Sequence, residues 1–185
     1  MRKLSMDELN RKTIEEFRGA EKLPIIVVLE NVRSAYNVGS VLRTADAFLL
    51  QAVYTTGYTP HPPHKQIDKT ALGAHESVHC KHFEDTKSAI AELKADGFTV
   101  YAAEQAQQSI LLHQLKAVDE QKIAVVLGNE VSGVEQDTIH LCDGCIEIPQ
   151  FGMKHSLNIS VAAGVLLWEF VKSSFMKLND KSTVE

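Results

Sequence analysis

The chain has 185 residues, of which 44% are hydrophobic and 23% charged, and its formal net charge is −5 at pH 7. This length suits one soluble globular domain, and three cysteines exclude a disulfide framework and favour a reducing, cytoplasmic location. The longest apolar stretch, residues 161–168, is far shorter than the roughly 18 residues of a membrane span. We therefore expect neither a membrane segment nor a signal peptide.

The charges are unevenly distributed. Residues 84–147 carry twelve acidic residues against four lysines, whereas residues 57–82 carry three lysines, two acidic residues and five of the eight histidines. The net acidic charge argues against a non-specific nucleic-acid coat. A locally basic RNA-binding face and a merely solvated mixed surface both remain open.

The N-terminal half is predicted to alternate helices and strands. Residues 4–20 place apolar and charged residues at helical spacing and predict an amphipathic helix. The run PIIVVLE from Pro24 predicts a strand buried on both faces, and residues 38–49 predict a helix with one apolar face. A strand at 52–56 is followed by a long loop at 57–70, rich in Pro, Gly and His.

The C-terminal half continues this alternation. Strands are predicted at 98–103, 123–127 and 145–148, and helices at 85–95, 108–116, 134–141 and about 157–175. Such an order is typical of βαβ units. We expect an α/β fold with a mostly parallel sheet covered by helices on both faces, followed by a frayed polar tail.

The first candidate site segment is NVGSVLRTAD, residues 37–46. Asn37 is placed to cap the helix, and Gly39 allows close backbone approach. Arg43 shares a polar helix face with Ser40 and Asp46. It either forms a surface pair with Asp46 or binds a phosphate or a developing oxyanion.

The second candidate segment is Leu127-Gly128-Asn129-Glu130, directly after an apolar strand. Ligands of open α/β sheets bind beyond the carboxyl ends of the strands. Gly128 would let a ligand approach the backbone, and Glu130 could accept hydrogen bonds or hold a cation. An ordinary strand-ending turn is the alternative, since neither common glycine-rich nucleotide fingerprint is present.

The third candidate segment, Ser156-Leu157-Asn158, opens the last helix. Ser156 either caps this helix or contacts a ligand, and Asn158 is expected one turn inside it, where a polar group needs a partner. The small residues Ser160, Ala163 and Gly164 would permit close packing against another helix or subunit.

Cysteines and histidines give no sign of a metal centre. Cys142 and Cys145 form a lone C-x-x-C, which we interpret as buried small hydrophobes. The histidines between residues 61 and 82, with Cys80, match no tetrahedral ligand pattern. We expect no metal site.

Read together, three segments resemble the three motifs of the SpoU (TrmH-like) RNA ribose methyltransferases of the SPOUT superfamily. They are ENVRSAYNVGSVLRTADAF (30–48), VVLGNEVSGV (125–134) and IEIPQFGMKHSLNISVAAGVLLWE (146–169), in family order and spacing. The resemblance covers roughly residues 24–172. It implies a parallel α/β fold with a C-terminal deep trefoil knot, a homodimer, and three parts: a helical extension (1–22), the methyltransferase domain (23–175) and a polar tail (176–185).

The resemblance also implies an activity, the S-adenosylmethionine-dependent methylation of a ribose 2′-hydroxyl in structured RNA, either tRNA or rRNA. A catalytically silent RNA-binding or assembly factor and a base-directed methyltransferase of the same fold are the alternatives. The catalytic residues that it implies are Asn37, Arg43, Glu130, Ser156 and Asn158. The cofactor-binding residues that it implies are Glu104, Leu127, Gly128, Asn129, Ile148, Ser156 and Leu157. RNA contact is expected from Arg33, Lys65 and Lys69.

Overall fold

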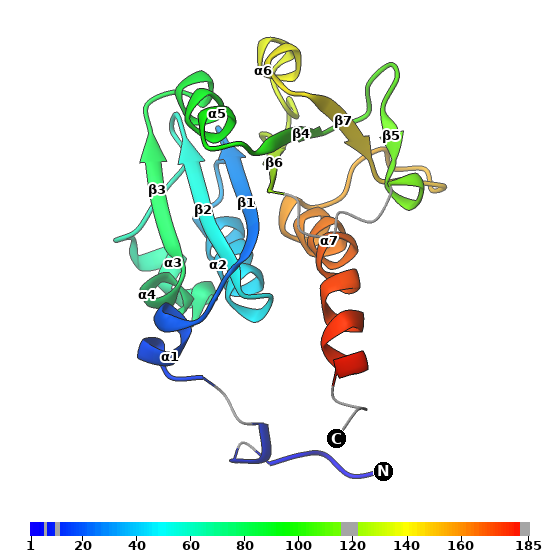
Figure 1. Cartoon of the computed structure of the whole chain (residues 1–185). Coiled ribbons are helices and arrows are strands. Elements are labelled where there is room, and N and C mark those ends of the chain that lie inside the picture. Colours follow the sequence, from blue (N-terminus) through cyan, green and yellow to red (C-terminus); the bar gives the residue numbers. More distant parts are fainter. Residues whose placement is uncertain (6, 10–11, 116–121, 182–185) are drawn as a thin grey trace.

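Seven parallel strands form one sheet in the order β3-β2-β1-β6-β4-β7-β5 (Figure 1). The structure, a computed structural model, describes residues 1–5, 7–9, 12–115 and 122–181. The strands are β1 (Leu23–Glu30), β2 (Leu50–Thr56), β3 (His79–Phe83), β4 (Thr99–Ala103), β5 (Ile110–Leu111), β6 (Ile123–Leu127) and β7 (Gly144–Glu147). The expected α/β fold with a parallel sheet is confirmed.

Helices cover both faces of this sheet, as expected. They are α1 (Ile14–Gly19), α2 (Ala35–Ala47), α3 (Lys65–Ala71), α4 (Ala74–Ser77), α5 (Thr86–Ala95), α6 (Gln136–Leu141) and α7 (Ile159–Lys181), with 3₁₀ turns at Asp7–Leu9 and Leu112–Gln114. Side chains alternate along a strand, so β1 contributes Val27 to one core with α2, α3 and α7, and Val28 to another with α5. This double burial explains the continuous apolar run of β1.

The strand order reverses between β1 and β6, the two central neighbours. β1 leads outward to β2 and β3, whereas β6 is followed by β4, β7 and β5 on the other side. Leu29 of β1 lies beside Leu127 of β6, so these two strands end at the same edge. Ligands of doubly wound sheets bind in the crevice at such a reversal. A ligand site is therefore expected at this edge of the sheet.

One predicted helix is wrong in extent and another is wrong outright. The described residues of 4–20 contain a 3₁₀ turn and the short α1 in place of one continuous helix, because a capping box between Thr13 and Glu16 starts a new helix there. Residues 108–115 form β5 and a 3₁₀ turn, since Ile110 and Leu111 pair with β7. Residue 116 of that predicted helix and residues 6, 10 and 11 of the first lie outside the described residues.

The segment 57–83 has more structure than its composition indicated. The predicted loop 57–70 contains the start of α3, and the chain continues through α4 into the edge strand β3. The sequence of β3, HCKHF, is too polar to predict a buried strand. It pairs only with β2, and its residues are exposed or half-buried. An edge strand tolerates this composition.

The last helix differs in extent and in its exposed face. α7 begins at Ile159 and continues to Lys181, beyond the predicted end at about 175; residues 182–185 of the predicted tail lie outside the described residues. Of the small residues, Ala163 is fully buried. Among the side chains of α7 that the structure describes, residues 159–172, the large exposed apolar ones are instead Val161, Val165 and Trp168. Their spacing of four and three residues puts them on one stripe.

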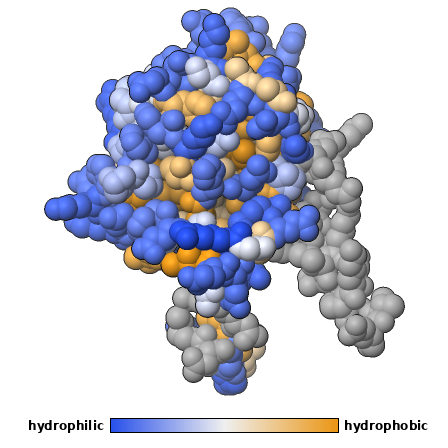
Figure 2. All heavy atoms as spheres, turned by 60° about the vertical axis from the view of Figure 1, so that its left-hand side comes forward, coloured by the Kyte–Doolittle hydropathy of each residue, from blue (hydrophilic) through white to orange (hydrophobic). Residues whose placement is uncertain are grey.

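Within the described ranges, no helix has the length and apolar character that a membrane crossing requires. The face seen in Figure 2, which turns the β3 side of the molecule forward, is mostly hydrophilic, with hydrophobic residues in small separate patches. Scattered patches of this kind are usual on globular proteins.

Candidate functional site

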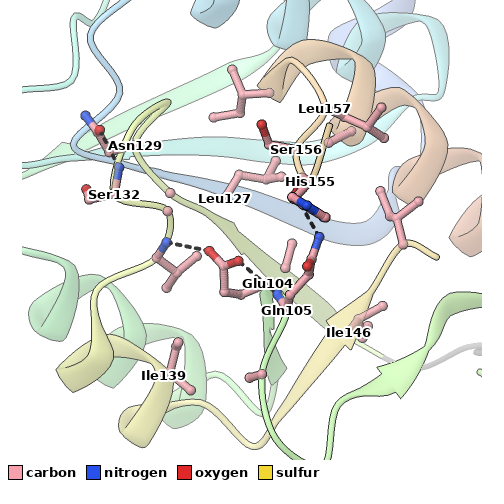
Figure 3. Close-up of a pocket in the computed structure, with 18 of the residues that line it drawn as sticks. Glu104, Gln105, Leu127, Asn129, Ser132, Ile139, Ile146, His155, Ser156 and Leu157 are labelled. Carbon is pink, nitrogen blue, oxygen red and sulfur yellow. Dashed lines mark hydrogen bonds between the residues drawn. The ribbon is translucent and has the colours of Figure 1, made fainter. Parts of the chain in front are cut away.

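A cavity of about 1120 Å³ lies at the carboxyl edge of the sheet, where the loops after β4, β6 and β7 meet (Figure 3). Its volume is ample for a ligand of nucleoside size. Its walls include all seven residues expected to bind a cofactor: Glu104, Leu127, Gly128, Asn129, Ile148, Ser156 and Leu157. The seven residues, which come from three separate segments of the sequence, therefore lie around one cavity. Their contact with a cofactor stays a prediction.

The loop after β6 turns back tightly on its first residue. Backbone bonds join Asn129 and Gly133 in both directions, at 3.0 and 2.9 Å. A Cβ atom on Gly128 would lie 2.1 Å from the carbonyl carbon of Gly133 and 2.2 Å from the amide nitrogen of Val134. Only glycine at position 128 allows this approach.

The side chain of Asn129 holds this loop to its neighbours. Its Nδ2 donates to the carbonyl of Asn31 at 2.8 Å and to the hydroxyl of Tyr58 at 2.9 Å. Its Oδ1 accepts hydrogen bonds from the backbone N–H groups of Val131 and Ser132. All four hydrogen-bonding positions of the amide are used within the protein. Asn129 thus lines the cavity but acts by positioning the residue that follows it.

That following residue, Glu130, joins the loop to the start of α2. Its Oε2 accepts from the Arg33 backbone N–H at 3.0 Å, and its Oε1 accepts from the Ser34 N–H at 3.1 Å and from Asn37 Nδ2 at 3.0 Å. A carboxylate at a helix N-terminus is also favoured by the helix dipole. Partial burial raises the pKa of Glu130, but these hydrogen bonds outweigh it, so the pKa lies below its ordinary value of 4.5.

We expect Glu130→Gln to destabilise the fold by about 1–2 kcal/mol at pH 7, because a glutamine amide cannot accept all three hydrogen bonds. A lowered folded-state pKa stabilises the protein above the ordinary pKa of 4.5, and this contribution is lost as pH falls through the folded value. Urea unfolding at pH 7 and pH 4 should therefore show the difference shrinking in acid. An equal difference at both pH values would contradict the assignment, and Glu15→Gln on α1 controls for general charge effects.

Asn37 connects Glu130 to the last helix. Its Oδ1 accepts a hydrogen bond from Asn158 Nδ2 at 3.2 Å, across 121 positions of sequence. Asn158 directly precedes α7, and its Oδ1 accepts from the Ser160 backbone N–H at 2.9 Å. Asn158 thus caps the helix, and its expected place one turn inside is wrong.

The prediction that Asn37 caps α2 is also wrong, and of the two roles left open for Ser156 the helix cap is not the one observed. Ser34 caps α2, its hydroxyl accepting from the Asn37 N–H at 3.3 Å, so Asn37 lies inside the first turn with its side chain available to Glu130. Ser156 lies before the α7 cap as an exposed residue lining the cavity. Asn37 and Ser156 are thus not occupied in capping a helix, and their side chains are available to the site.

The wall after β4 is built by a carboxylate and an amide (Figure 3). Glu104 accepts from its neighbour Gln105 N–H at 2.9 Å and from the Val134 N–H at 3.1 Å. Gln105 Nε2 donates to the carbonyl of His155 at 2.8 Å. These bonds tie β4 to the loops after β6 and β7 and thereby hold three sides of the cavity together.

Arg43 is separated from this cluster. It lies on α2 six residues after Asn37, which is about 9 Å along the helix and about 120° around it. It is exposed, does not line the cavity, and makes no hydrogen bond or ion pair with any residue that the structure describes. The surface pair with Asp46 is absent, because Asp46 accepts from Ser77 instead, at 3.0 Å.

The comparison with known proteins identifies the family. A model of the SpoU rRNA methylase family matches residues 24–168, well over half of the chain. The chain belongs to this SpoU family. It is 37% identical to a tRNA (guanosine(18)-2′-O)-methyltransferase of Thermus thermophilus, over 88% of this chain and 81% of that protein. It is 31% identical to a 23S rRNA (guanosine-2′-O-)-methyltransferase of Vibrio parahaemolyticus, over 89% of this chain and 66% of that one.

A solved structure agrees with this membership. The A. aeolicus TrmH/SpoU tRNA modifying enzyme superposes with a TM-score of 0.77 and 26% identity, covering 89% of this chain and 83% of that chain. The parallel α/β fold expected from the SpoU resemblance is thereby shown, and its trefoil knot stays a prediction.

The residues expected to contact RNA lie outside the cavity of this SpoU protein. Arg33 is exposed, and its backbone N–H bonds Glu130, so its side chain starts beside the polar cluster. Lys65 and Lys69 are exposed on α3. Thr70 of α3 donates to the carbonyl of Tyr36 in the first turn of α2, which places α3 next to the site. RNA contact by these three residues stays a prediction.

Sequence analysis missed one buried carboxylate of the SpoU site. Glu30, at the end of β1, is only 1% exposed. Its oxygens accept from the Glu135 N–H at 2.9 Å and from the Thr138 hydroxyl at 2.5 Å. Glu30 thereby holds the start of α6, which directly follows the loop of Glu130. An acidic residue ending an otherwise apolar strand was the available signal.

The cysteines behave as apolar residues. Cys145 is buried and Cys142 half-buried, and neither is in a disulfide. Burial raises the pKa of both thiols, that of Cys142 to about 12, so neither is a ready nucleophile or ligand. Among the described residues no cluster of three His, Cys, Asp or Glu side chains could hold a metal ion.

Proposed function

We propose that this SpoU protein is an S-adenosylmethionine-dependent methyltransferase that modifies a ribose 2′-hydroxyl in tRNA or rRNA. The observation that carries the proposal is the hydrogen-bonded chain Glu130–Asn37–Asn158 at the rim of the cavity. It brings together one residue from each of the three segments that resemble the SpoU motifs. Relatives that share most of the chain are named as guanosine 2′-O-methyltransferases of tRNA and 23S rRNA.

The cavity fits the cofactor chemically. Leu127, Ile148 and Leu157 supply apolar walls for an adenine ring, and the backbone of Gly128 lines the same cavity. Glu104 puts a carboxylate on the same wall, suited to ribose hydroxyls or to a cationic sulfonium. When bound, S-adenosylmethionine supplies a methyl group on a good leaving group.

The remaining task of the protein is to position and activate the hydroxyl. Asn37 and Asn158, fixed by Glu130 and by the α7 cap, would orient the nucleotide at the cavity rim. Arg43, with its planar fork of N–H donors, would stabilise the developing alkoxide and the nearby phosphate. Ser156 would contact the nucleotide or the cofactor from the loop before α7.

The same proposal includes a homodimer. The stripe of Val161, Val165 and Trp168 on α7 is exposed and apolar, and Trp168 contacts Phe48 at the end of α2 with ring centroids 6.1 Å apart. A second copy that covers this stripe would also reach the exposed side of α2, which carries Arg43. The distance of Arg43 from the cavity of its own chain favours a site completed across the dimer.

The organisation of the chain is proposed with it. A helical extension (1–22) precedes the methyltransferase domain (23–175), whose C-terminal part forms a deep trefoil knot, and a polar tail (176–185) follows. We propose a cytoplasmic location, where tRNA and rRNA are modified and where the unpaired thiols stay reduced.

Incubation with methyl-labelled S-adenosylmethionine and total tRNA or rRNA tests the activity. After nuclease digestion, the label is expected in 2′-O-methyl nucleosides of one RNA class. Label in a base would instead support a base-directed enzyme of the same fold. RNA binding without any transfer would support a silent RNA-binding factor, and both results would overturn the proposal.

A further inference from the structure

One exposed aromatic ring lies directly beside the polar cluster and belongs to none of the three motif segments. Tyr58, in the loop after β2, is 59% exposed. Its hydroxyl accepts a hydrogen bond from Nδ2 of Asn129, which is 6% exposed and precedes Glu130. Exposed aromatic residues are common and usually need no explanation. Here a buried amide fixes the polar end of the ring and leaves the ring itself in solvent.

The rest of this loop is also fixed. Thr59, only 2% exposed, donates its hydroxyl proton to the carbonyl of Leu29 and accepts from the Val32 N–H, both at 2.9 Å. His61 stacks on His82 of β3 with ring centroids 4.0 Å apart. After Tyr58 the loop is therefore tied to β1 by Thr59 and to β3 by His61, and before it the Gly57 N–H donates to the carbonyl of Phe83 in β3 at 3.1 Å. A side chain presented in a fixed orientation loses little entropy when it binds a ligand.

The surroundings of Tyr58 indicate what kind of ligand its exposed ring would bind. The chain that follows it carries the exposed Lys65 and Lys69 on α3, and α3 contacts the first turn of α2 through the hydrogen bond from Thr70 to the carbonyl of Tyr36. Phosphate-binding charge and an aromatic ring therefore lie on segments around the same polar cluster. Exposed polar residues, not a contiguous apolar patch, follow the ring along the chain. Single-stranded nucleic acid instead combines charged phosphates with flat bases that stack on aromatic side chains.

We propose that Tyr58 stacks on an unpaired nucleobase of the substrate RNA, close to the nucleotide whose ribose is methylated. The inference rests on the proposed function for the identity of the substrate. It adds an RNA-contacting residue on the β2–α3 loop, outside the cofactor cavity. The hydrogen bond from Asn129 couples the ring to the loop of Glu130, so the base and the polar cluster keep a fixed spacing.

Three variants test this, with total tRNA and total rRNA as probes in equilibrium binding. Tyr58→Leu keeps an apolar side chain but removes stacking, and we expect RNA affinity to fall between about fivefold and 150-fold. Tyr58→Phe keeps the ring and is expected to lose less than about threefold. Lys69→Ala serves as the charge control: it should lower the slope of log affinity against log salt by about 0.7–0.9, whereas Tyr58→Leu should leave that slope unchanged.

Wild-type affinity in Tyr58→Leu would overturn the inference, as would equal losses in Tyr58→Leu and Tyr58→Phe, because the hydroxyl and not the ring would then matter. Cofactor affinity should stay unchanged in all three variants, since Tyr58 and Lys69 do not line the cavity. The two proposals fail differently. RNA binding that depends on the Tyr58 ring without any 2′-O-methylation would refute the proposed activity and leave the stacking intact.

Discussion

Replacing Arg43 by alanine is expected to lower the rate of methyl transfer at least a hundredfold, because the developing alkoxide loses its charged donor. The affinity for S-adenosylmethionine, measured by titration calorimetry, should stay within about twofold, since Arg43 does not line the cavity. Stability should also be unchanged, as exposed side chains without partners contribute little. Transfer that persists in Arg43→Ala would remove Arg43 from the mechanism. Arg2→Ala, an exposed arginine at the N-terminus, is the matched control.

The position of Arg43 also predicts complementation between two inactive variants. If Arg43 serves the cavity of a partner copy, a mixed dimer of Arg43→Ala and Glu130→Gln chains contains one complete site. After random exchange, half of the dimers are mixed and each has one of two sites intact, so activity should recover to about a quarter of wild type. No recovery in a mixture that forms dimers would place Arg43 and Glu130 of one chain in the same site.

Gly128→Ala is expected to have the largest effect on the cavity. The new Cβ atom would lie 2.1–2.2 Å from backbone atoms of Gly133 and Val134, and backbone cannot move aside as a flexible side chain does. Overpacking of this kind costs about 1–3 kcal/mol, which lowers Tm by about 2–12 °C in a protein of this size. Since the same loop forms a cavity wall, we expect affinity for S-adenosylmethionine to fall at least about tenfold, a loss of about 1.4 kcal/mol.

Gly19→Ala provides the matched control for this substitution. A Cβ atom at position 19 would meet no atom within 4 Å outside its own stretch of α1, and alanine favours a helix. We expect unchanged cofactor affinity and an unchanged or slightly higher Tm. Equal behaviour of the two alanine variants in differential scanning calorimetry and cofactor titration would show that the approach at Gly128 is unimportant.

The strands were predicted well where their burial is simple. β1 and β6 are central, buried on both faces, and their apolar runs reveal them directly. The sequence did not predict β3 and β5, because each is an edge strand of the described sheet. Such a strand pairs on one side only, and these two have polar or half-exposed residues. Such strands are stabilised mainly by pairing with a neighbouring strand, and this neighbour lies elsewhere in the chain.

The structure brings some of the predicted site residues together. The sequence singled out Asn37, Glu130 and Asn158, and these three are joined by hydrogen bonds. The sequence interpretation made Asn37 the cap of α2 and Ser156 one candidate for the cap of α7, whereas Ser34 and Asn158 cap these helices. Residues that could cap occur close together at both positions, and local propensity cannot rank them when tertiary contacts favour one.

The sequence by itself determined the class of fold and the SpoU family and supplied a set of candidate site residues, since apolar periodicity and motif spacing are local properties of the chain. Only the tertiary structure decided which of these residues meet. It joins Glu130 to Asn37 across 93 positions and Asn158 to Asn37 across 121, and it separates Arg43 from both. It also sets Tyr58 against Asn129 across 71 positions. The physical reason is that parallel strands bring loops from distant segments to one edge, while register and helix phase fix where each side chain points.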